Sequence, residues 1–497
     1  MKKWLKRIVL LLLLLAVAGA GTAWWLMRGS LATLDGELAL AGLSAPVAIQ
    51  RDANGTVTID ATNEIDAMRA LGYVHAQERF FEMDLMRRVS TGELSELFGA
   101  IAIEKDKAQR VHRIRSRVEA DLAGMAAGKR PQLEAYTAGV NAGLGALRTR
   151  PWPYLLLQQT PRRWELADSA LVGYAMYFDL QDATNHRELA MWKIKPHLPP
   201  ALYALLARDG TRWDAPLTGA ARGDAVLPTP EEVDLRKLPA PPGKRHGVAA
   251  DDIVPGSNNF AVAGAVGKDG RAIVANDMHL GLGVPNIWFR ARLRYADARA
   301  PDGKVDITGF TLPGLPAVVV GSNTRVAWAF TNSYVDTSDW RIHTRCGGPA
   351  TDASVCVNPV SHAEIIRVAG GAPVEFEVEE TEWGPVLHRD GDKLFALRWN
   401  AHAKGALGFG LTDFPTARDL DHAITLADRS AMPAQNLLIG DASGRIAWRV
   451  IGPLAQRTTG CDPALPGTDT EQAAACTPWA VATDRSPNLI DPADHRL

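Results

Sequence analysis

The spacing of apolar residues separates a helical first half of the chain from a second half built of strands. Between residues 63 and 99, apolar side chains recur at helical spacing with Glu and Arg between them, at Ile65, Met68, Leu71, Phe81, Leu85 and Val89. This period is typical of one face of an amphipathic helix. We expect further helices within 112–148 and 165–208.

The segment 209–256 lies between the two halves and is predicted to be a spacer. It has few apolar runs long enough to bury, and prolines, which interrupt regular elements, stand at positions 216, 228, 230, 239, 241, 242 and 255. After it, alternating apolar residues predict two hairpins, which turn at Lys268–Gly270 and at Asp441–Gly444. Residues 310–332 add two more strands. Helices followed by strands predict an α+β fold.

The N-terminus has the pattern of an export signal or a membrane anchor. Lys2, Lys3, Lys6 and Arg7 precede an uncharged apolar run, Ile8 to Met27, which ends with Trp24 and Trp25 before Arg28. The run is long enough to cross a bilayer, which needs about 20 residues. We favour an uncleaved anchor in the inner membrane with the rest in the periplasm; the small residues Ala18-Gly19-Ala20 leave cleavage and secretion open.

These patterns predict four parts: a signal or anchor at 1–30, a helical region at 31–208, the spacer at 209–256 and a β-rich region at 257–497. The net charge of −2, without basic blocks, argues against nucleic acid as a partner. The four cysteines fall into two sequence-local pairs without a zinc-like spacing, Cys346 with Cys356 and Cys461 with Cys476. Two disulfides in an oxidising compartment are expected, and four partly buried free thiols are the alternative.

Ser257 lies at the junction between the spacer and the first predicted strand, directly after Gly256. The motifs G-x-S-x-G, H-E-x-x-H, the P-loop and G-x-G-x-x-G do not occur. Cleavage between Gly256 and Ser257 would give Ser257 a free amine, which can act as the base for its own hydroxyl. On composition alone, a turn serine that starts a hairpin is the simpler interpretation.

Several ordered motifs change that balance. They are "GYVHAQERFFEMDLMRRVSTGELSELFG", "GSNNFAVAG", "ANDMHL", "LPGLPAVVVGSNTRVAWAFTN" and "QNLLIGDASGRIAW". Together, and over nearly the whole chain after the anchor, this set resembles the penicillin acylase family of N-terminal nucleophile hydrolases, which includes acyl-homoserine lactone acylases. The resemblance implies an αββα sandwich, a precursor cut into associated α and β chains, and hydrolysis of an amide between an acyl group and an amine.

The resemblance also implies roles for particular residues. Ser257 would be the nucleophile that begins the β chain, and His279, 22 positions later (279 − 257), would bond to its amine. The backbone N–H of Asn332 would be an oxyanion donor. One Ca²⁺ would be held by Glu188, Asp336 and Asp339, and no organic cofactor is implied. Without the resemblance, His279 could equally be a histidine at the end of a strand that bonds to the backbone. Each of the three acids could equally be a solvated carboxylate in a loop.

The resemblance places the acyl pocket at Met176–Asp182, just after Ser257 and around Thr311–Val319, stretches with few charges. A hydrophobic acyl group is therefore expected, and His at position 279 favours an aliphatic chain over phenylacetyl. The chain ends at Leu497, before the family's second oxyanion residue, an Asn, so we expect a C-terminally incomplete sandwich. Two hypotheses stay open: an exported amidohydrolase of N-acyl compounds such as β-lactams or N-acyl-homoserine lactones, and a truncated, catalytically impaired relic or binding module.

Overall fold

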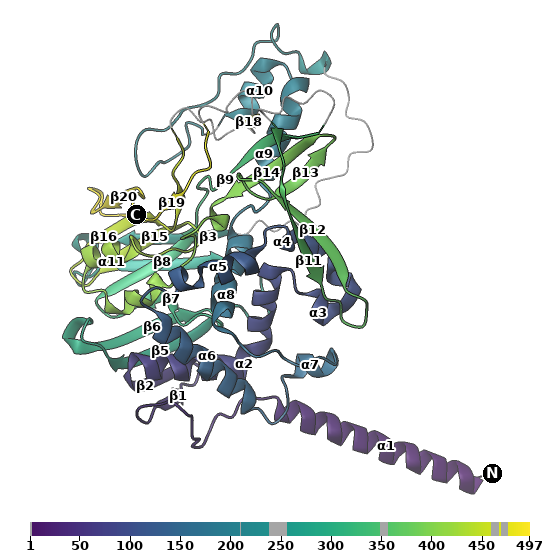
Figure 1. The fold of residues 1–497 in the computed structure, drawn as a ribbon. Coiled ribbons are helices and arrows are strands. Elements are labelled where there is room, and N and C mark those ends of the chain that lie inside the picture. Colours follow the sequence, from purple (N-terminus) through teal and green to yellow (C-terminus); the bar gives the residue numbers. More distant parts are fainter. Residues whose placement is uncertain (1, 209, 238–255, 348–355, 459–466, 469–475) are drawn as a thin grey trace.

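The computed structural model describes residues 2–208, 210–237, 256–347, 356–458, 467–468 and 476–497. Its architecture is α+β, as the sequence predicts, with helices gathered in the first part of the chain and strands in the second (Figure 1). The α-helices are α1 (Lys2–Gly29), α2 (Glu64–Thr91), α3 (Ser95–Phe98), α4 (Ile103–Arg110), α5 (Ile114–Met125), α6 (Arg130–Gly145), α7 (Trp152–Leu156), α8 (Leu166–Leu180), α9 (His186–Ile194), α10 (Pro200–Ala207) and α11 (Leu420–Ala427).

Each predicted helical segment is shorter or more divided than the periodicity indicated. The segment 112–148 forms α5 and α6, and 165–208 forms α8, α9 and α10. In addition, the region expected to be helical contributes two strands, β1 (Ala48–Arg51) and β2 (Val57–Asn63). The strand β1 was missed because it has only four residues, and β2 because it directly precedes a strong helical pattern. Asn63 ends β2 and caps α2, its side chain accepting a hydrogen bond from the Asp66 N–H at 2.9 Å.

The main sheet has nine strands in the order β1-β2-β5-β6-β7-β8-β15-β16-β20. Its further strands are β5 (Phe289–Ala296), β6 (Lys304–Thr311), β7 (Val318–Ser322), β8 (Val326–Asn332), β15 (Gln435–Asp441), β16 (Ile446–Ile451) and β20 (Asn488–Ile490). The hairpin predicted around Asp441–Gly444 is β15–β16, and β7 and β8 are the two strands predicted within 310–332.

The two faces of the main sheet are covered by different layers. Leu437 and Ile439 of β15 pack into the large core that also contains the buried residues of α2, whereas Leu438 between them packs against Ala261 and Ala263. Alternate residues of a strand point to opposite faces. One face therefore carries the helices, and the other carries the hairpin of β3 (Gly256–Val262) and β4 (Ile273–His279), which the sequence predicted after the spacer.

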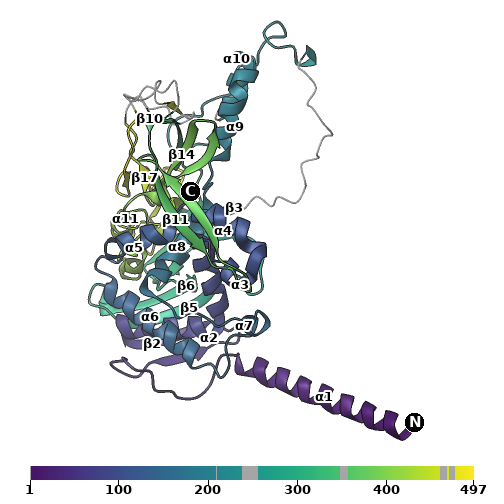
Figure 2. The same cartoon turned by 45° about the vertical axis from the view of Figure 1, so that its right-hand side comes forward.

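A smaller sheet and a long hairpin arm stand beside these layers. The smaller sheet contains β9 (Ser338–Arg345), β10 (Cys356–Val357), β13 (Val386–Asp390), β14 (Lys393–Trp399) and β18 (Gly467–Thr468), and β17 (Leu454–Ala455) pairs with β19 (Val481–Ala482). The arm is β11 (Val360–Ile366) with β12 (Val374–Glu380), and it lies across α3 and α4 in both views (Figures 1 and 2). Its Glu380 pairs with Arg113 at 3.1 Å.

Helices α2 and α6 cross at very short distance because glycines stand at the contact. A Cβ at Gly139 would lie 2.0 Å from the Arg69 carbonyl oxygen, and one at Gly143 would lie 2.3 Å from that of Tyr73. No side chain fits in either place. This close crossing holds α2, which carries His75 and the buried Arg87, in a fixed position under the main sheet.

Candidate active site

Ser257 lies in β3, on the face of the hairpin that is turned towards the rest of the molecule. In the β3–β4 register it stands opposite Met278, and both residues line the same cavity. The Ser257 Oγ donates a hydrogen bond to the carbonyl oxygen of Gly256 at 2.6 Å. The hydroxyl therefore lies beside the carbonyl group of the peptide bond that precedes it.

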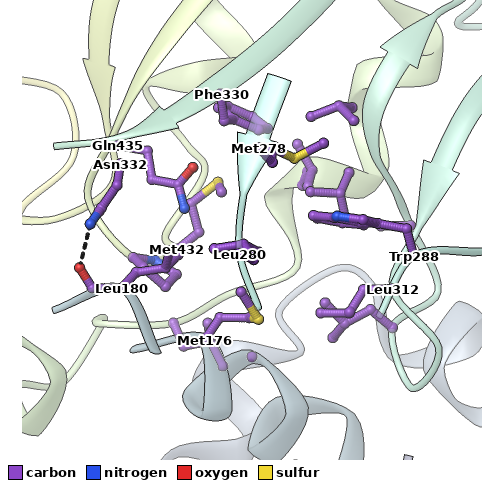
Figure 3. A pocket seen from close by; sticks show the side chains of 18 of the residues that line it. Met176, Leu180, Met278, Leu280, Trp288, Leu312, Phe330, Asn332, Met432 and Gln435 are labelled. Carbon is purple, nitrogen blue, oxygen red and sulfur yellow. Dashed lines mark hydrogen bonds between the residues drawn. The ribbon is translucent and has the colours of Figure 1, made fainter. Parts of the chain in front are cut away.

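The cavity beside Ser257 has a volume of about 100 Å³ and forms where the β3–β4 hairpin, β8 and α8 meet (Figure 3). Most of its lining is aliphatic, aromatic or thioether, and the polar side chains are those of Ser257, Asn332, Thr412 and Gln435. The apolar lining residues are Met176, Leu180, Met278, Leu280, Trp288, Leu312, Leu315, Ala317, Val319, Val320, Phe330, Leu407, Phe409, Leu411, Met432 and Pro433, with Gly173 and Gly408. Such a cavity suits an apolar group whose one polar end reaches Ser257.

Two of the three stretches that the resemblance assigned to the pocket contribute to this cavity. Met176 and Leu180 come from 176–182, and Leu312, Leu315, Ala317 and Val319 come from 311–319. From the third stretch, Ser257 itself lines the cavity, whereas no residue of β3 after it does.

His279 lies next to Gly256 but on the outer face of the hairpin. It pairs with Gly256 across the two strands, one position away from the Ser257–Met278 pair, so its side chain points away from the cavity. A Cβ placed at Gly256 would lie 3.8 Å from His279 Nδ1. The imidazole is thus a neighbour of the bond between Gly256 and Ser257 and is absent from the cavity lining.

Asp277 is a residue of this neighbourhood that the sequence reasoning missed. Its Oδ2 lies 2.8 Å from His279 Nε2, which leaves the Nδ1 edge of the ring towards Gly256. Residues two positions apart on a strand share a face, so the spacing of Asp277 and His279 in "ANDMHL" carried this signal. A carboxylate at one ring nitrogen favours the tautomer in which the other nitrogen accepts a proton.

Asn332 closes one end of the cavity at the C-terminal end of β8. Its side-chain amide donates to the carbonyl oxygen of Leu180 at the end of α8, at 2.7 Å (Figure 3). Its own carbonyl oxygen accepts from the side chain of Asn436 at 3.0 Å. The structure therefore brings Asn332 and Ser257 to one cavity, and Asn332 also ties the helical layer to the sheet.

A buried polar network supports the wall of the cavity from behind. His75 lies between the Tyr136 hydroxyl, 2.7 Å from its Nδ1, and the Thr311 hydroxyl, 2.9 Å from its Nε2. The Tyr136 hydroxyl also accepts a hydrogen bond from the backbone N–H of Gly314 at 2.8 Å. Complete burial lowers the pKa of His75 to about 3, so the ring is neutral.

The network fixes the loop between Leu312 and Ala317, which forms part of the cavity wall. Gly314 has a φ of +109°, and a Cβ there would lie 2.6 Å from Val172 of α8, so the loop is pressed against that helix. The sequence reasoning did not assign His75 or Tyr136. The partners of His75, Tyr136 and Thr311, come from distant parts of the chain, so no local pattern indicated the network.

Glu188, Asp336 and Asp339 come together in one cluster, as the resemblance implied. One carboxylate oxygen from each lies within 4.8 Å of the others. Arg457 enters the same cluster, with its guanidinium 3.1 Å from Asp336 and 2.9 Å from Asp339, and Trp479 Nε1 donates to Asp339 at 2.5 Å. The Oε2 atom of Glu188 is buried and has no hydrogen-bond partner among the described residues.

The electrostatics of this cluster fit a bound cation. Burial, assisted by Asp339 and Asp336, raises the pKa of Glu188 to about 8. Burial also raises the pKa of Asp336 to about 6, against the opposing effect of Arg457. Three carboxylates and one guanidinium carry an excess of negative charge when ionised, and hard carboxylate oxygens are the ligands that Ca²⁺ takes.

The structure joins Cys346 to Cys356 in a disulfide. Cys476 is also disulfide-bonded, while Cys461 lies outside the described residues. Among the described residues no free cysteine occurs, which agrees with the expected oxidised state.

Comparison with known proteins matches this chain to one protein family. Residues 46–497 match the family model described as penicillin amidase. Penicillin acylase 2 proenzyme of a Pseudomonas species is 31% identical over 498 residues, covering 94% of this chain and 60% of that protein. Acyl-homoserine lactone acylase QuiP of Pseudomonas aeruginosa is 28% identical, covering 89% of this chain and 54% of that protein. The chain thus spans little more than half the length of the curated relatives it matches.

Among solved structures, a thermostable penicillin G acylase from Alcaligenes faecalis in orthorhombic form is 20% identical, with a TM-score of 0.41. The match covers 48% of this chain and 43% of that chain. At this TM-score the likeness adds nothing to the fold as described.

The network behind the cavity wall gives a first test. Tyr136→Phe leaves the N–H of Gly314 and one ring nitrogen of His75 buried without a partner, which costs about 1–3 kcal/mol for each unsatisfied group. We expect a lower free energy of unfolding in urea, and faster proteolysis of the 312–317 loop under native conditions. Tyr174→Phe is the control, because no hydrogen bond of its hydroxyl occurs among the described residues. Equal stability of the two variants would contradict the role of Tyr136.

Proposed function

The chain belongs to the penicillin amidase family, and we propose on that premise that it is an exported precursor of an amidohydrolase of N-acyl compounds, with Ser257 as its nucleophile. The observation that carries the proposal is the position of Ser257. Its hydroxyl donates a hydrogen bond to the carbonyl oxygen of Gly256, and the residue lines an apolar cavity of about 100 Å³. One residue can thus serve both self-cleavage and acyl transfer.

Self-cleavage would begin with attack of the Ser257 Oγ on the carbonyl carbon of Gly256. The C–N bond breaks as the C–O bond forms, so the acyl group moves from nitrogen to oxygen and the Ser257 amine is released. Water then hydrolyses the ester and leaves a carboxylate at Gly256. His279, whose Nδ1 faces Gly256, is placed to take or return the proton of the amine.

The freed amine would then act as the base for amide hydrolysis. An α-amine has a pKa of about 7.7–8.0, so near neutral pH it can accept the proton of its own hydroxyl. The Ser257 Oγ attacks the substrate carbonyl, the amine product leaves with the proton, and water hydrolyses the acyl ester. The backbone N–H of Asn332 is our candidate donor to the oxyanion, and such a donor contributes on the order of 10²–10³ in rate.

The cavity favours an aliphatic acyl group. Three flexible methionines, Met176, Met278 and Met432, line it, and thioether side chains can adjust to chains of different length. An N-acyl-homoserine lactone or an aliphatic penicillin presents such a chain.

We further propose that one Ca²⁺ binds between Glu188, Asp336 and Asp339. The buried, unpartnered Oε2 of Glu188 and the raised pKa of that group support it. The site would bridge the parts of the chain before and after Ser257. It would hold the α and β chains of the processed protein together.

Export is proposed from α1, which is the one helix among the described residues long and apolar enough to cross a membrane. Its side chains are exposed along almost the whole length, so the folded body does not use them as core. We place the body in the periplasm, with α1 as its inner-membrane anchor.

Maturation provides the main test of the nucleophile. In the wild-type chain we expect cleavage before Ser257, so that N-terminal sequencing of the new fragment begins Ser-Asn-Asn-Phe. Ser257→Ala should abolish cleavage and turnover, and Ser257→Cys should still process, because a thiol is the stronger nucleophile. Ser361→Ala, on the exposed arm, is the matched control. A folded wild-type chain that stays uncut and inactive would favour the alternative of a binding module.

Calcium binding is tested by thermal unfolding after treatment with a chelator. Added Ca²⁺ at 100 times its Kd should stabilise the wild-type chain by about 2.7 kcal/mol. Glu188→Gln should lose this gain, yet be no less stable than wild type in chelator, since the raised pKa of Glu188 already favours its uncharged form when no cation is bound. Glu119→Gln, with an exposed carboxylate on α5, should respond to Ca²⁺ like wild type. An equal gain in the Glu188 variant would refute the assignment.

Acyl preference is tested by kcat/KM on three substrates measured side by side. An N-acyl-homoserine lactone and an aliphatic penicillin should exceed penicillin G by about tenfold or more, within the range that small differences in apolar fit produce. A series of acyl lengths shows where the methionine-lined cavity is filled. Preference for phenylacetyl amides would contradict the proposed pocket.

A further inference from the structure

The C-terminal end of α1 is fastened to the body by the loop before α7. The backbone N–H of Thr149 donates to the carbonyl oxygen of Gly29 at 3.1 Å, and the Thr149 hydroxyl donates to that of Leu26 at 2.8 Å. Gly29 is buried at this contact, where a Cβ would lie 2.9 Å from the Thr149 side chain. The direction of α1 relative to the body is therefore set by packing and hydrogen bonds.

Around this junction the body exposes large apolar side chains. They are Leu31, Leu34 and Leu38, in the segment that follows α1, and Trp152 and Leu156, on α7. Both views show α7 beside the junction (Figures 1 and 2). We call these five residues the root surface. Leu31, Leu34 and Trp152 line one hollow at the junction. Exposed apolar patches that are large and contiguous mark interaction sites.

The exposure on α7 is a consequence of how this short helix is fixed. Tyr154 lies between Trp152 and Leu156 in sequence, is fully buried, and donates from its hydroxyl to Asp84 at 2.6 Å. That anchor turns Trp152 and Leu156 outward. Leu156 is 73% exposed and Trp152 45% exposed.

Arginines near the root surface can bind phosphate groups. Arg28, Arg148 and Arg150 make no ion pair within 4.0 Å among the described residues. Asp35, Glu78 and Glu82 line the same hollow as Arg28 and Arg148, and Glu78 pairs with Arg51, so groups of both charges lie at the root. Trp24 and Trp25 on the last turns of α1 are exposed too. Tryptophan together with arginine is the composition found at the interface between lipid and water.

We propose that the root surface docks on the periplasmic surface of the same bilayer that α1 crosses, with the arginines on the phosphate groups of phospholipids. The inference rests on the proposed anchor and adds a second, peripheral contact to it. Because Thr149 fixes α1 to the body, insertion of the helix brings Leu31 and Leu156 to the membrane together. The partner is phospholipid, and the result is a body held in one orientation on the membrane.

The test uses the full chain in vesicles of phosphatidylethanolamine and phosphatidylglycerol. Leu156→Cys is labelled with a fluorophore sensitive to polarity, and its quenching by lipids with a nitroxide near the headgroup is measured. Trp25→Cys reports on the anchor, and Tyr334→Cys, at a residue that is 93% exposed between β8 and β9, reports on the body away from the root. Circular dichroism checks that each variant is folded.

We expect quenching at position 156 several-fold above that at position 334. The double substitution Arg148→Glu with Arg150→Glu should reduce the quenching at 156 without changing it at position 25. Quenching at 25 but not at 156 would overturn the docking surface and leave the anchor intact. No quenching at either position would overturn both. Equal quenching at 156 and 334 would also refute a specific docking face.

Discussion

The position of Ser257 depends on the packing of one hairpin against two strands of the main sheet. Ala261 and Ala263 of the β3 side meet Leu438 and Ile446 in a small core of their own. The side-chain amide of Asn276 in β4 adds a polar link, because it donates to the carbonyl oxygen of Phe330 in β8 at 2.8 Å. This pairing fixes which face of β3 is turned inward. Since side chains alternate along the strand, it also decides that Ser257 faces the cavity and His279 faces away from it.

The parts of the chain before and after Ser257 interlock at several places, so a cut between Gly256 and Ser257 would leave them bound. The side-chain amide of Asn332 donates to the carbonyl oxygen of Leu180, and that of Asn185 donates to the carbonyl oxygen of Ser338 at 3.1 Å. In addition, Arg113 forms an ion pair with Glu380. The large core contains residues from both parts, including α2 and β15. Removal of one covalent bond at the start of β3 does not expose that core.

Local patterns in the sequence predicted those features that depend on neighbouring residues. The hairpin turning at Asp441–Gly444, the two strands within 310–332 and the amphipathic α2 all follow from periodicity and turn residues. Features that depend on distant contacts were missed. Tyr136 and Thr311 meet His75 from 61 and 236 positions away, and Arg457 reaches Asp339 from 118 positions away. The strand β2 was missed because one of its partners, β5, lies far along the chain.

The carboxylate cluster of Glu188, Asp336 and Asp339 is only partly neutralised by the side chains around it. Asp339 is already well supplied with donors, since Arg457 and Trp479 both contact it. Glu188 has a buried oxygen without a partner, and its raised pKa shows that the folded chain disfavours its charged form. A divalent cation would reverse that preference and add a bond between α9 and the segment before β9. Arg457 would then remain as the counter-charge of Asp339, so the cation need balance only Glu188 and Asp336.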